Sequence, residues 1–300
     1  MKKQLTRKQF DILERLATAK TSLSYQEFEK NTDYSRESIN SVVRDLSDLG
    51  YVKDGMITNA GINTLEPYRV RRAVFIAAGF GTRLVPITFN TPKPLVRVHG
   101  QRIIDGLIDA CLDAGINEIY IVRGYLAEQF DQLLYKYPML KFLENPIYNE
   151  ANNISSAMVA RYMLSNAYVF EADLFISNPQ IIKPYHYASN FLGIKKEYTD
   201  DWCVTVKDGI ITEEKVGGKG PDCWQMIGIS YWDDIDGHKL SQDIKEVYEA
   251  PGGKERYWEQ VPLVYRKDHY LVEIRPCREE DIVEIDTFRE LKAIDRTYDV

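Results

Sequence analysis

Two glycines, an arginine and a lysine follow one apolar run and carry the clearest chemistry in this chain. The run Ala73–Ala78 is typical of a buried strand, and Gly79 and Gly81 form the turn after it. Backbone N–H groups in such a turn can hold phosphate oxygens. Arg83 and Lys93, the latter between two prolines, add the fixed positive charge that a triphosphate requires. The stretch therefore predicts nucleotide chemistry.

Neither of the two common phosphate-binding motifs fits this stretch. Residues 79–84 supply the first two glycines of G-x-G-x-x-G, but Leu84 stands at the third position, which argues against a dinucleotide site. The chain contains no G-x-x-x-x-G-K-[ST] sequence, which excludes a P-loop. An ordinary strand-to-helix turn would account for the glycines alone. It would not account for a lysine whose backbone is fixed by a proline on each side.

A longer set of motifs resembles the nucleotidyltransferases that activate sugars and alcohol phosphates. The first motif is residues 79–84 with Pro86, Thr88 and the run 91–95. Further motifs are similar to bacterial CTP:phosphocholine cytidylyltransferases, and they are residues 124–130, 152–156, 171–173, 201–202, 257–258 and 284–286. The resemblance covers residues 72–295. Close relatives in that family act instead on 2-aminoethylphosphonate or other phosphonates, so the resemblance leaves both acceptors open.

The composition is that of an ordinary globular protein. The chain has 300 residues, 44% hydrophobic and 28% charged, which allows more than one domain. It has no run of about 18 apolar residues, and its basic start lacks the apolar part of a signal peptide. We expect no membrane contact and a cytoplasmic location. The four cysteines form no zinc pattern, so we expect free thiols in a reducing compartment, at Cys111, Cys203, Cys223 and Cys277.

The charge divides the chain into two parts. Residues 1–72 carry 13 basic and 10 acidic side chains, a net charge of +3, whereas the remainder carries 25 and 35, a net charge of −10. This asymmetry predicts two domains with different partners. We place the first domain at residues 1–70 and a nucleotidyltransferase domain at residues 71–300.

The first domain resembles a winged helix-turn-helix domain of bacterial regulators. We expect helices over 6–17, 25–30, 36–49 and 59–68, with a hairpin over 51–58 before the last of them. The third helix of such a domain would enter the major groove of DNA. Its DNA-facing residues would be Arg36, Glu37, Asn40, Ser41 and Arg44. A charge of +3 is low for a DNA-binding protein, so a dimerisation or ligand-sensing role is the alternative.

Strands and helices alternate in the second domain. We expect strands over 73–78, 118–122, 141–144 and 167–170, and helices over 103–114, 127–135 and 153–164. This order predicts an α/β, Rossmann-like domain with a mainly parallel sheet. Gly79, Gly124 and Asp173 each follow an expected strand, and ligands bind at the carboxyl ends of such strands. After residue 200 we expect strands over 202–206, 209–212, 225–231 and 269–274, then a helix over 287–294.

The resemblance implies attack of a phosphate or phosphonate oxygen on the α-phosphorus of CTP, with release of pyrophosphate. The nucleophile is already ionised, so positioning and charge neutralisation carry the catalysis. Mg²⁺ suits this task, and the resemblance implies Asp173 and Asp286 as its ligands. Glu171 would reach a metal-bound water or have a structural role. Lys93 would bridge the α-phosphate and the acceptor, and Arg83 would hold the β- and γ-phosphates.

The remaining candidate site residues divide between the nucleotide and the acceptor. The expected nucleotide-binding residues are Ala78, Gly79, Gly81, Thr82, Gly124, Tyr125, Asn153 and Ser155. The expected acceptor-binding residues are Trp202, Tyr257, Trp258 and Glu284. Aromatic faces with a carboxylate bind a quaternary ammonium, and Asp200 or Asp201 could also supply that charge. A primary amine would suit the same pocket.

Two other functions compete with the cytidylyltransferase hypothesis. One is a DNA-binding regulator whose transferase domain senses a nucleotide or choline, although a sensor has no need of Lys93, Asp173 and Asp286. The other is a sugar-1-phosphate nucleotidyltransferase, which the short chain after Asp173 disfavours. The sequence carries no signal for an oligomeric state.

Overall fold

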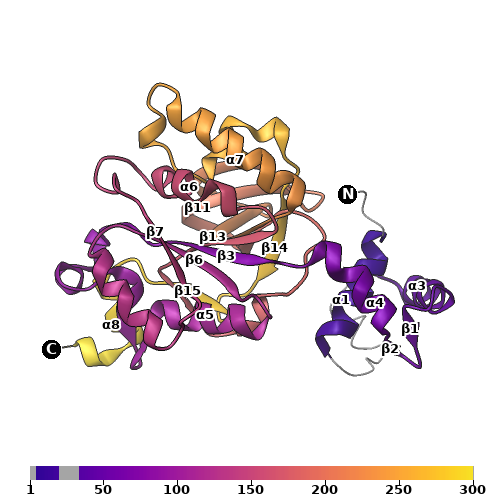
Figure 1. The fold of residues 1–300 in the computed structure, drawn as a ribbon. Helices are drawn as coiled ribbons and strands as arrows, with labels where there is room; N and C mark the ends of the chain where they lie inside the picture. Colours follow the sequence, from indigo (N-terminus) through magenta and orange to yellow (C-terminus); the bar gives the residue numbers. More distant parts are fainter. Residues whose placement is uncertain (1–4, 20–33, 300) are drawn as a thin grey trace. The chain divides into compact units, whose positions relative to one another are not determined.

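The computed structural model describes residues 5–19 and 34–299 and divides the chain into two compact units. The first comprises Met1–Arg69 with Tyr185–Tyr187, and the second comprises Val70–Pro184 with Ala188–Val300 (Figure 1). The helix expected over 25–30 lies outside the described residues.

The first unit contains three described helices and a short hairpin. They are α1 (Arg7–Ala19), α3 (Arg36–Asp48), β1 (Val52–Lys53), β2 (Met56–Ile57) and α4 (Asn59–Leu65). The hydroxyl of Ser35 accepts a hydrogen bond from the N–H of Ser38, which caps the start of α3. Asp54 and Gly55 both have positive φ, as an Asp-Gly hairpin turn requires.

Side chains from both ends of this unit's sequence build its core. Phe10, Leu13, Ile39 and Leu46 are buried there at the helical spacing expected from the sequence. The chain returns to this unit at residues 185–187, where the ring of Tyr187 stacks on that of Tyr68 with centroids 5.7 Å apart. The sequence did not predict this return.

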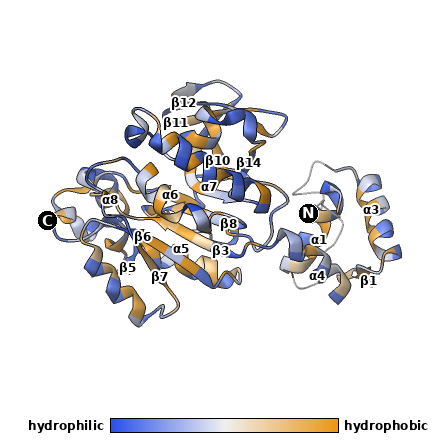
Figure 2. Ribbon diagram, turned by 45° about the horizontal axis from the view of Figure 1, so that its top comes forward, coloured by the Kyte–Doolittle hydropathy of each residue, from blue (hydrophilic) through white to orange (hydrophobic). Residues whose placement is uncertain are grey.

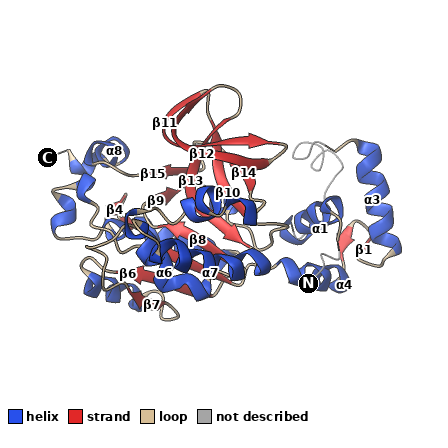
Figure 3. Cartoon of the chain, turned by 90° about the horizontal axis from the view of Figure 1, so that it is seen from above, coloured by secondary structure: helices blue, strands red, loops and turns tan. Residues whose placement is uncertain are grey.

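The second unit is built on a nine-stranded mixed sheet. The strands are β3 (Arg72–Ile76), β6 (Glu118–Arg123), β7 (Lys141–Glu144), β8 (Ala167–Glu171), β10 (Asn190–Lys195), β11 (Tyr198–Lys207), β12 (Ile210–Lys219), β13 (Cys223–Trp232) and β14 (Glu273–Cys277). Their order is β10-β14-β12-β11-β13-β8-β3-β6-β7. The long strands β11 and β12 thus lie away from the end of the sheet that β7 forms (Figure 3).

The expectation of a mainly parallel sheet is correct for only one part of this sheet. Strands β8, β3, β6 and β7 run parallel, because a helical crossover separates each from the next along the chain. Strands β11 and β12 are joined by a two-residue turn and pair antiparallel, as neighbours joined by so short a turn must. Strand β13 follows β12 after three residues, but it pairs antiparallel with β11 on the other side.

Helices cover both faces of the parallel strands, and each face has its own core (Figure 1). Alternate residues of β3 point to opposite faces: Phe75 packs with α5 (Ile103–Asp113), and Val74 packs with α6 (Ile154–Ala160) and α7 (Asp234–Glu249). The middle residues of β3, β6 and β8 are hydrophobic and buried (Figure 2), as in strands that are covered on both faces.

Several elements differ from the sequence expectation. The helix expected over 127–135 is present with these bounds as a 3-10 helix, and the helix expected over 153–164 is α-helical over Ile154–Ala160 and 3-10 over Arg161–Met163. Strand β10 and helix α7 were not predicted. The signal for α7 was present, because Asp233 caps its start and Leu240, Ile244 and Val247 follow at helical spacing.

A small hydrophobic cluster joins the loop after β3 to the end of the chain. Leu84 and Val96 pack there with Ile285 and Leu291, the latter from α8 (Phe288–Ile294). Four short strands frame this region: β4 (Arg97–Val98) pairs with β5 (Gln101–Arg102), and β9 (Leu174–Ile176) pairs with β15 (Ile282–Glu284). The cluster therefore fixes residues 82–98 beside residues 284–291.

None of the described helices is both long enough and apolar enough to cross a membrane.

Candidate active site

The glycine turn after β3 lies against Lys93. Gly81 has a φ of 64°, a conformation that favours glycine, and a Cβ on it would lie 3.0 Å from the Cβ of Lys93. The hydroxyl of Thr88 donates to the carbonyl of Gly81 and closes the intervening loop. A side chain at position 81 would therefore push the lysine out of place.

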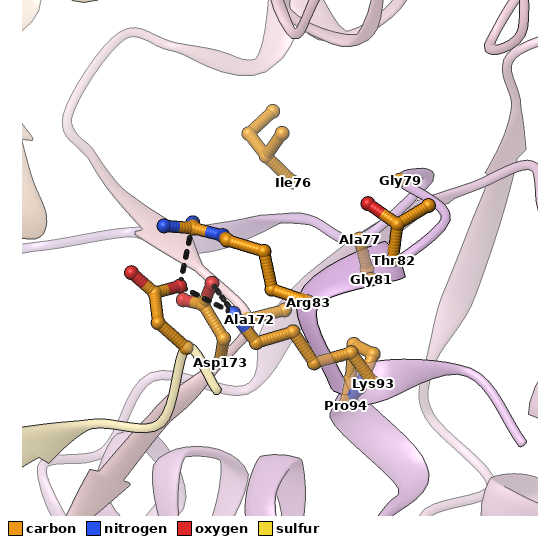
Figure 4. A pocket seen from close by; sticks show the side chains of 11 residues that line it. Ile76, Ala77, Gly79, Gly81, Thr82, Arg83, Lys93, Pro94, Ala172 and Asp173 are labelled. Atoms are coloured by element: carbon orange, nitrogen blue, oxygen red, sulfur yellow. Dashed lines mark hydrogen bonds and ion pairs between the residues drawn. The ribbon is translucent and has the colours of Figure 1, made fainter. Parts of the chain in front are cut away.

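Lys93 is buried and joins two carboxylates from distant parts of the chain. Its ammonium donates to Oδ2 of Asp173 at 2.7 Å and to Oδ1 of Asp286 at 2.8 Å. Arg83 donates to the same oxygen of Asp286 at 2.7 Å. Arg83 and Lys93 both point toward Asp173 in Figure 4. Burial opposes the charge of Lys93, but the two carboxylates outweigh it and raise the pKa of the lysine.

Strand pairing brings the two aspartates together. Asp173 follows the carboxyl end of β8, and Asp286 follows β15, which pairs antiparallel with β9. The N–H of Ile285 donates to the carbonyl of Asp173 at 3.1 Å. The backbone therefore holds these two residues side by side before any side chain interacts.

A pocket of about 280 Å³ opens at this edge of the sheet. Seven predicted site residues line it: Gly79, Gly81, Thr82, Arg83, Lys93, Asp173 and Asp286. The structure thus brings together the glycine turn, both cations and both aspartates. Ile76, Ala77, Pro94 and Ala172 complete the lining.

The carboxylates suited to a metal ion differ from the expected pair. Glu171, Asp173 and Glu284 each offer an oxygen within 4.8 Å of the others, whereas Asp286 is paired with Lys93 and Arg83. Oδ1 of Asp173 is buried and finds no hydrogen-bond partner in the described part of the chain. Clustered carboxylate oxygens are the donors that a hard divalent cation prefers, so these residues fit one.

The negative charges of the two glutamates in this cluster are unfavourable in the absence of a cation. Burial raises the pKa of Glu171 well above its usual range, and the charges of Glu259 and Asp173 raise it further. The pKa of Glu284 is raised in the same way, by burial and by Asp173 and Glu171. A bound cation would relieve this repulsion. Glu284, expected near the acceptor, therefore lies in the cluster that suits a metal ion.

Five residues expected at the nucleotide do not line the pocket, and they are Ala78, Gly124, Tyr125, Asn153 and Ser155. Ala78 accepts a hydrogen bond from the N–H of Tyr125, whose hydroxyl donates to the carbonyl of Thr88. Gly124 lies so close to the ring of Tyr148 that a Cβ would be 2.6 Å from it. Ser155 is buried and donates to the carbonyl of Asn152. These contacts hold the surrounding loops, and direct nucleotide binding by the five residues stays a prediction.

The expected acceptor residues divide between a surface and the core. The rings of Trp202 and Tyr257 meet edge to face with centroids 5.3 Å apart, and Tyr257 is exposed. Trp258 is buried and packs against Phe191 and Trp232, which favours packing over acceptor binding for this residue.

Two glutamates near these aromatic rings were not anticipated. Glu259 is buried and accepts a hydrogen bond from Asn153, which also accepts one from the N–H of Trp258. Asn153, expected at the nucleotide, thus holds the segment after Tyr257. Both carboxylate oxygens of Glu214 are buried without a partner in the described residues. No sequence signal marks Glu214, because its neighbours on both sides are also charged.

Comparisons with known proteins agree with this site. A family model described as Nucleotidyl transferase matches residues 72–180. The 2-aminoethylphosphonate cytidylyltransferase of Lancefieldella rimae is 37% identical over 75% of this chain and 92% of its own length. The choline-phosphate cytidylyltransferase of Streptococcus pneumoniae is 30% identical over 74% of this chain and 97% of its own length.

A solved structure supports the same relationship. The structure of CTP:phosphocholine cytidylyltransferase from Streptococcus pneumoniae covers 76% of this chain and 99% of its own, with 28% identity and a TM-score of 0.70. The matched share of the chain agrees with the extent of the second unit. This chain therefore belongs to the nucleotidyl transferase family, with cytidylyltransferases as its relatives over nearly their full length.

Proposed function

We propose that this enzyme transfers CMP from CTP to an aminoalkyl phosphate or phosphonate and releases pyrophosphate. Phosphocholine and 2-aminoethylphosphonate are the two acceptors that the relatives suggest. The observation that carries the proposal is the position of Lys93 beside Asp173 at the carboxyl end of β8, opposite a glycine turn. This arrangement joins phosphate binding, positive charge and carboxylates in one pocket.

Lys93 and Arg83 would neutralise negative charge on the phosphates of CTP, which otherwise repels the anionic acceptor. An oxygen of the acceptor attacks the α-phosphorus of CTP, the bond from this phosphorus to the bridging oxygen breaks, and pyrophosphate leaves. Lys93 would meet the acceptor oxygen and the α-phosphate, and Arg83 would hold the β- and γ-phosphates. Lys93 is buried and held by two aspartates before substrate arrives, so little reorganisation of this cation would accompany the reaction. The N–H groups of residues 79–82 would cradle the phosphates.

A divalent cation fits the carboxylates of this pocket. Glu171, Asp173 and Glu284 would hold it, with Asp286 available once phosphates compete for Lys93 and Arg83. When bound, Mg²⁺ would neutralise phosphate charge beside the α-phosphorus. The buried Oδ1 of Asp173, which has no hydrogen-bond partner among residues 5–19 and 34–299, supports this assignment.

The direct test is pyrophosphate release from CTP with Mg²⁺ and one acceptor at a time. Phosphocholine, 2-aminoethylphosphonate and glucose-1-phosphate are compared at equal concentration. We expect turnover with an aminoalkyl acceptor and little with the sugar phosphate. Preferential turnover with the sugar phosphate would replace the proposal with a sugar nucleotidyltransferase.

DNA binding by a winged helix in the first unit stays a prediction. Helix α3 carries the expected DNA-facing residues, which include Glu37 as well as Arg36 and Arg44, and it also carries Asp45 and Asp48. Phosphate attraction requires a basic face, so these acids weigh against strong binding. A gel shift with the upstream genomic region tests the role, and its loss in Arg36→Ala/Arg44→Ala would support it.

A further inference from the structure

The carboxyl group of Glu214 is buried, and the part of the chain that the structure describes offers it no hydrogen-bond partner. Both of its carboxylate oxygens are inaccessible to solvent and find no hydrogen bond among the described residues. Burial and the nearby charge of Glu259 raise the pKa of Glu214 to about 7. An unpaired buried carboxylate destabilises a fold, so a residue of this kind calls for a binding partner.

The position of Glu214 places it on the same face of the sheet as an aromatic surface. Glu214 on β12 lies opposite Val204 on β11, and Trp202 lies opposite Val216 in the same uninterrupted register. Opposite residues share a face, and so do residues two apart on one strand. Glu214 and Trp202 are therefore diagonal neighbours, and the ring of Trp202 contacts that of Tyr257.

Glu259 interacts electrostatically both with Glu214, near the aromatic rings, and with Glu171 of the carboxylate cluster. Glu259 follows Tyr257 by two residues, and its charge raises the pKa of both Glu214 and Glu171. Burial raises its own pKa to about 7. Acidic side chains thus lie both at the proposed phosphate site, with Asp173 and Glu171, and near the rings of Trp202 and Tyr257, with Glu214 and Glu259. Such an arrangement suits a molecule that carries a phosphate at one end and a cation at the other.

We infer that Glu214 and Glu259 bind a primary ammonium at the far end of the acceptor, so the enzyme prefers primary aminoalkyl phosphonates or phosphates over trimethylated ones. This inference rests on the proposed function. A primary ammonium has three N–H donors and can satisfy buried carboxylate oxygens, whereas a trimethylammonium has none. Aromatic faces alone would serve the trimethylated group, but they would leave Glu214 unpaired.

The test compares kcat/KM for three acceptors whose structures differ in one respect at a time. Phosphoethanolamine and phosphocholine share the phosphate and differ only in N-methylation. 2-Aminoethylphosphonate keeps the amine and replaces the ester oxygen. We expect the wild-type enzyme to prefer phosphoethanolamine over phosphocholine by about tenfold or more, the value of one charged hydrogen bond. Comparison of 2-aminoethylphosphonate with phosphoethanolamine then shows whether the enzyme prefers a phosphonate or a phosphate that carries the amine.

Glu214→Gln isolates the contribution of this carboxylate. We expect kcat/KM for phosphoethanolamine to fall about 10- to 100-fold, mainly through KM, with less than about a threefold change for phosphocholine. Glu213→Gln is the matched control, because Glu213 is the exposed neighbour on the opposite face of β12. Glu214→Asp keeps the charge and shortens its reach, and it replaces Glu214→Gln should that variant fail to fold.

Each outcome decides between the inference and the proposed function. A wild-type preference for phosphocholine would overturn the inference and leave CMP transfer intact, as would equal losses for both acceptors in Glu214→Gln. Absence of pyrophosphate release with all three acceptors would overturn the proposed function itself. An unchanged KM for CTP in Glu214→Gln would show that the nucleotide site is undisturbed and would support the assignment.

Discussion

The ammonium of Lys93 lies 2.7 Å from Oδ2 of Asp173, although 80 residues separate them. The loop after β3 supplies the cation, and the end of the neighbouring parallel strand β8 supplies the carboxylate. The same ammonium reaches Asp286, 193 residues away, through the pairing of β9 with β15. Three parts of the chain thus meet where a triphosphate would bring its negative charge.

Lys93→Ala removes the group that would meet the α-phosphate and the acceptor. We expect kcat to fall about 100- to 1,000-fold, because a preorganised charge at the reacting centre contributes several kcal/mol to the transition state. The measurement is steady-state pyrophosphate release. Lys245→Ala, at an exposed position on α7, is the control and should have wild-type rates. Normal turnover in Lys93→Ala would exclude this role for the lysine.

Metal binding should depend more on Asp173 than on Asp286. Asp173 groups with two glutamates and has a buried oxygen to offer, whereas Asp286 is already paired with Lys93 and Arg83. Without nucleotide, Asp173→Asn should weaken Mn²⁺ binding at least about tenfold, and Asp286→Asn should weaken it less. Electron paramagnetic resonance of free Mn²⁺ measures both. The reverse order would make Asp286 the principal ligand.

Stability should depend on pH through Glu214. Its pKa is about 7 in the folded protein, above its usual value of 4.5. Between these values the folded state holds a proton that the unfolded state has lost, so stability falls as pH rises from about 5 to 7. Glu214→Gln removes this contribution, so its stability relative to the wild type should be higher at pH 8 than at pH 5.5. Urea unfolding at both values measures the difference, and a pH-independent difference would argue against the raised pKa.

Trp202→Ala should weaken acceptor binding without affecting the nucleotide. A cation over an aromatic face contributes about 0.5–2 kcal/mol, so KM for the acceptor should rise about 2- to 30-fold. Trp202→Phe keeps a ring and should recover most of the loss. KM for CTP is the internal control in each variant. Equal increases in both KM values would indicate that Trp202 only supports the fold of β11.

The nucleotide end of the site was predictable because simple rules govern it. Gly79, Gly81 and Asp173 follow apolar strands, and parallel strands end at the same edge of a sheet. The flanking prolines marked Lys93 as a residue with a fixed backbone. The structure brings all four residues into one pocket.

The acceptor end was not predictable, because its residues depend on packing that the sequence does not mark. Strand β12 carries charges on both faces, so the alternation that identifies a buried face is missing around Glu214. Glu259 lies in an irregular segment whose position is set by a hydrogen bond from Asn153. The mixed sheet was missed because apolar patterns after residue 200 indicate strands but not which strands pair or in which direction.

The return of residues 185–187 to the first unit also lay beyond sequence rules. Three residues carry no periodicity, and their aromatic rings would fit a core anywhere in the chain. Only the structure shows that Tyr187 stacks on Tyr68 in the core of the first unit.

Identification of the product formed from CTP and an aminoalkyl phosphonate tests the central claim most directly. Phosphorus NMR with mass spectrometry follows 2-aminoethylphosphonate, CTP and Mg²⁺ with the wild-type enzyme. The account predicts CMP joined through an oxygen of the acceptor to its phosphorus, with one pyrophosphate released for each molecule formed. Free CMP without a joined product, or unchanged CTP with every aminoalkyl acceptor, would contradict it.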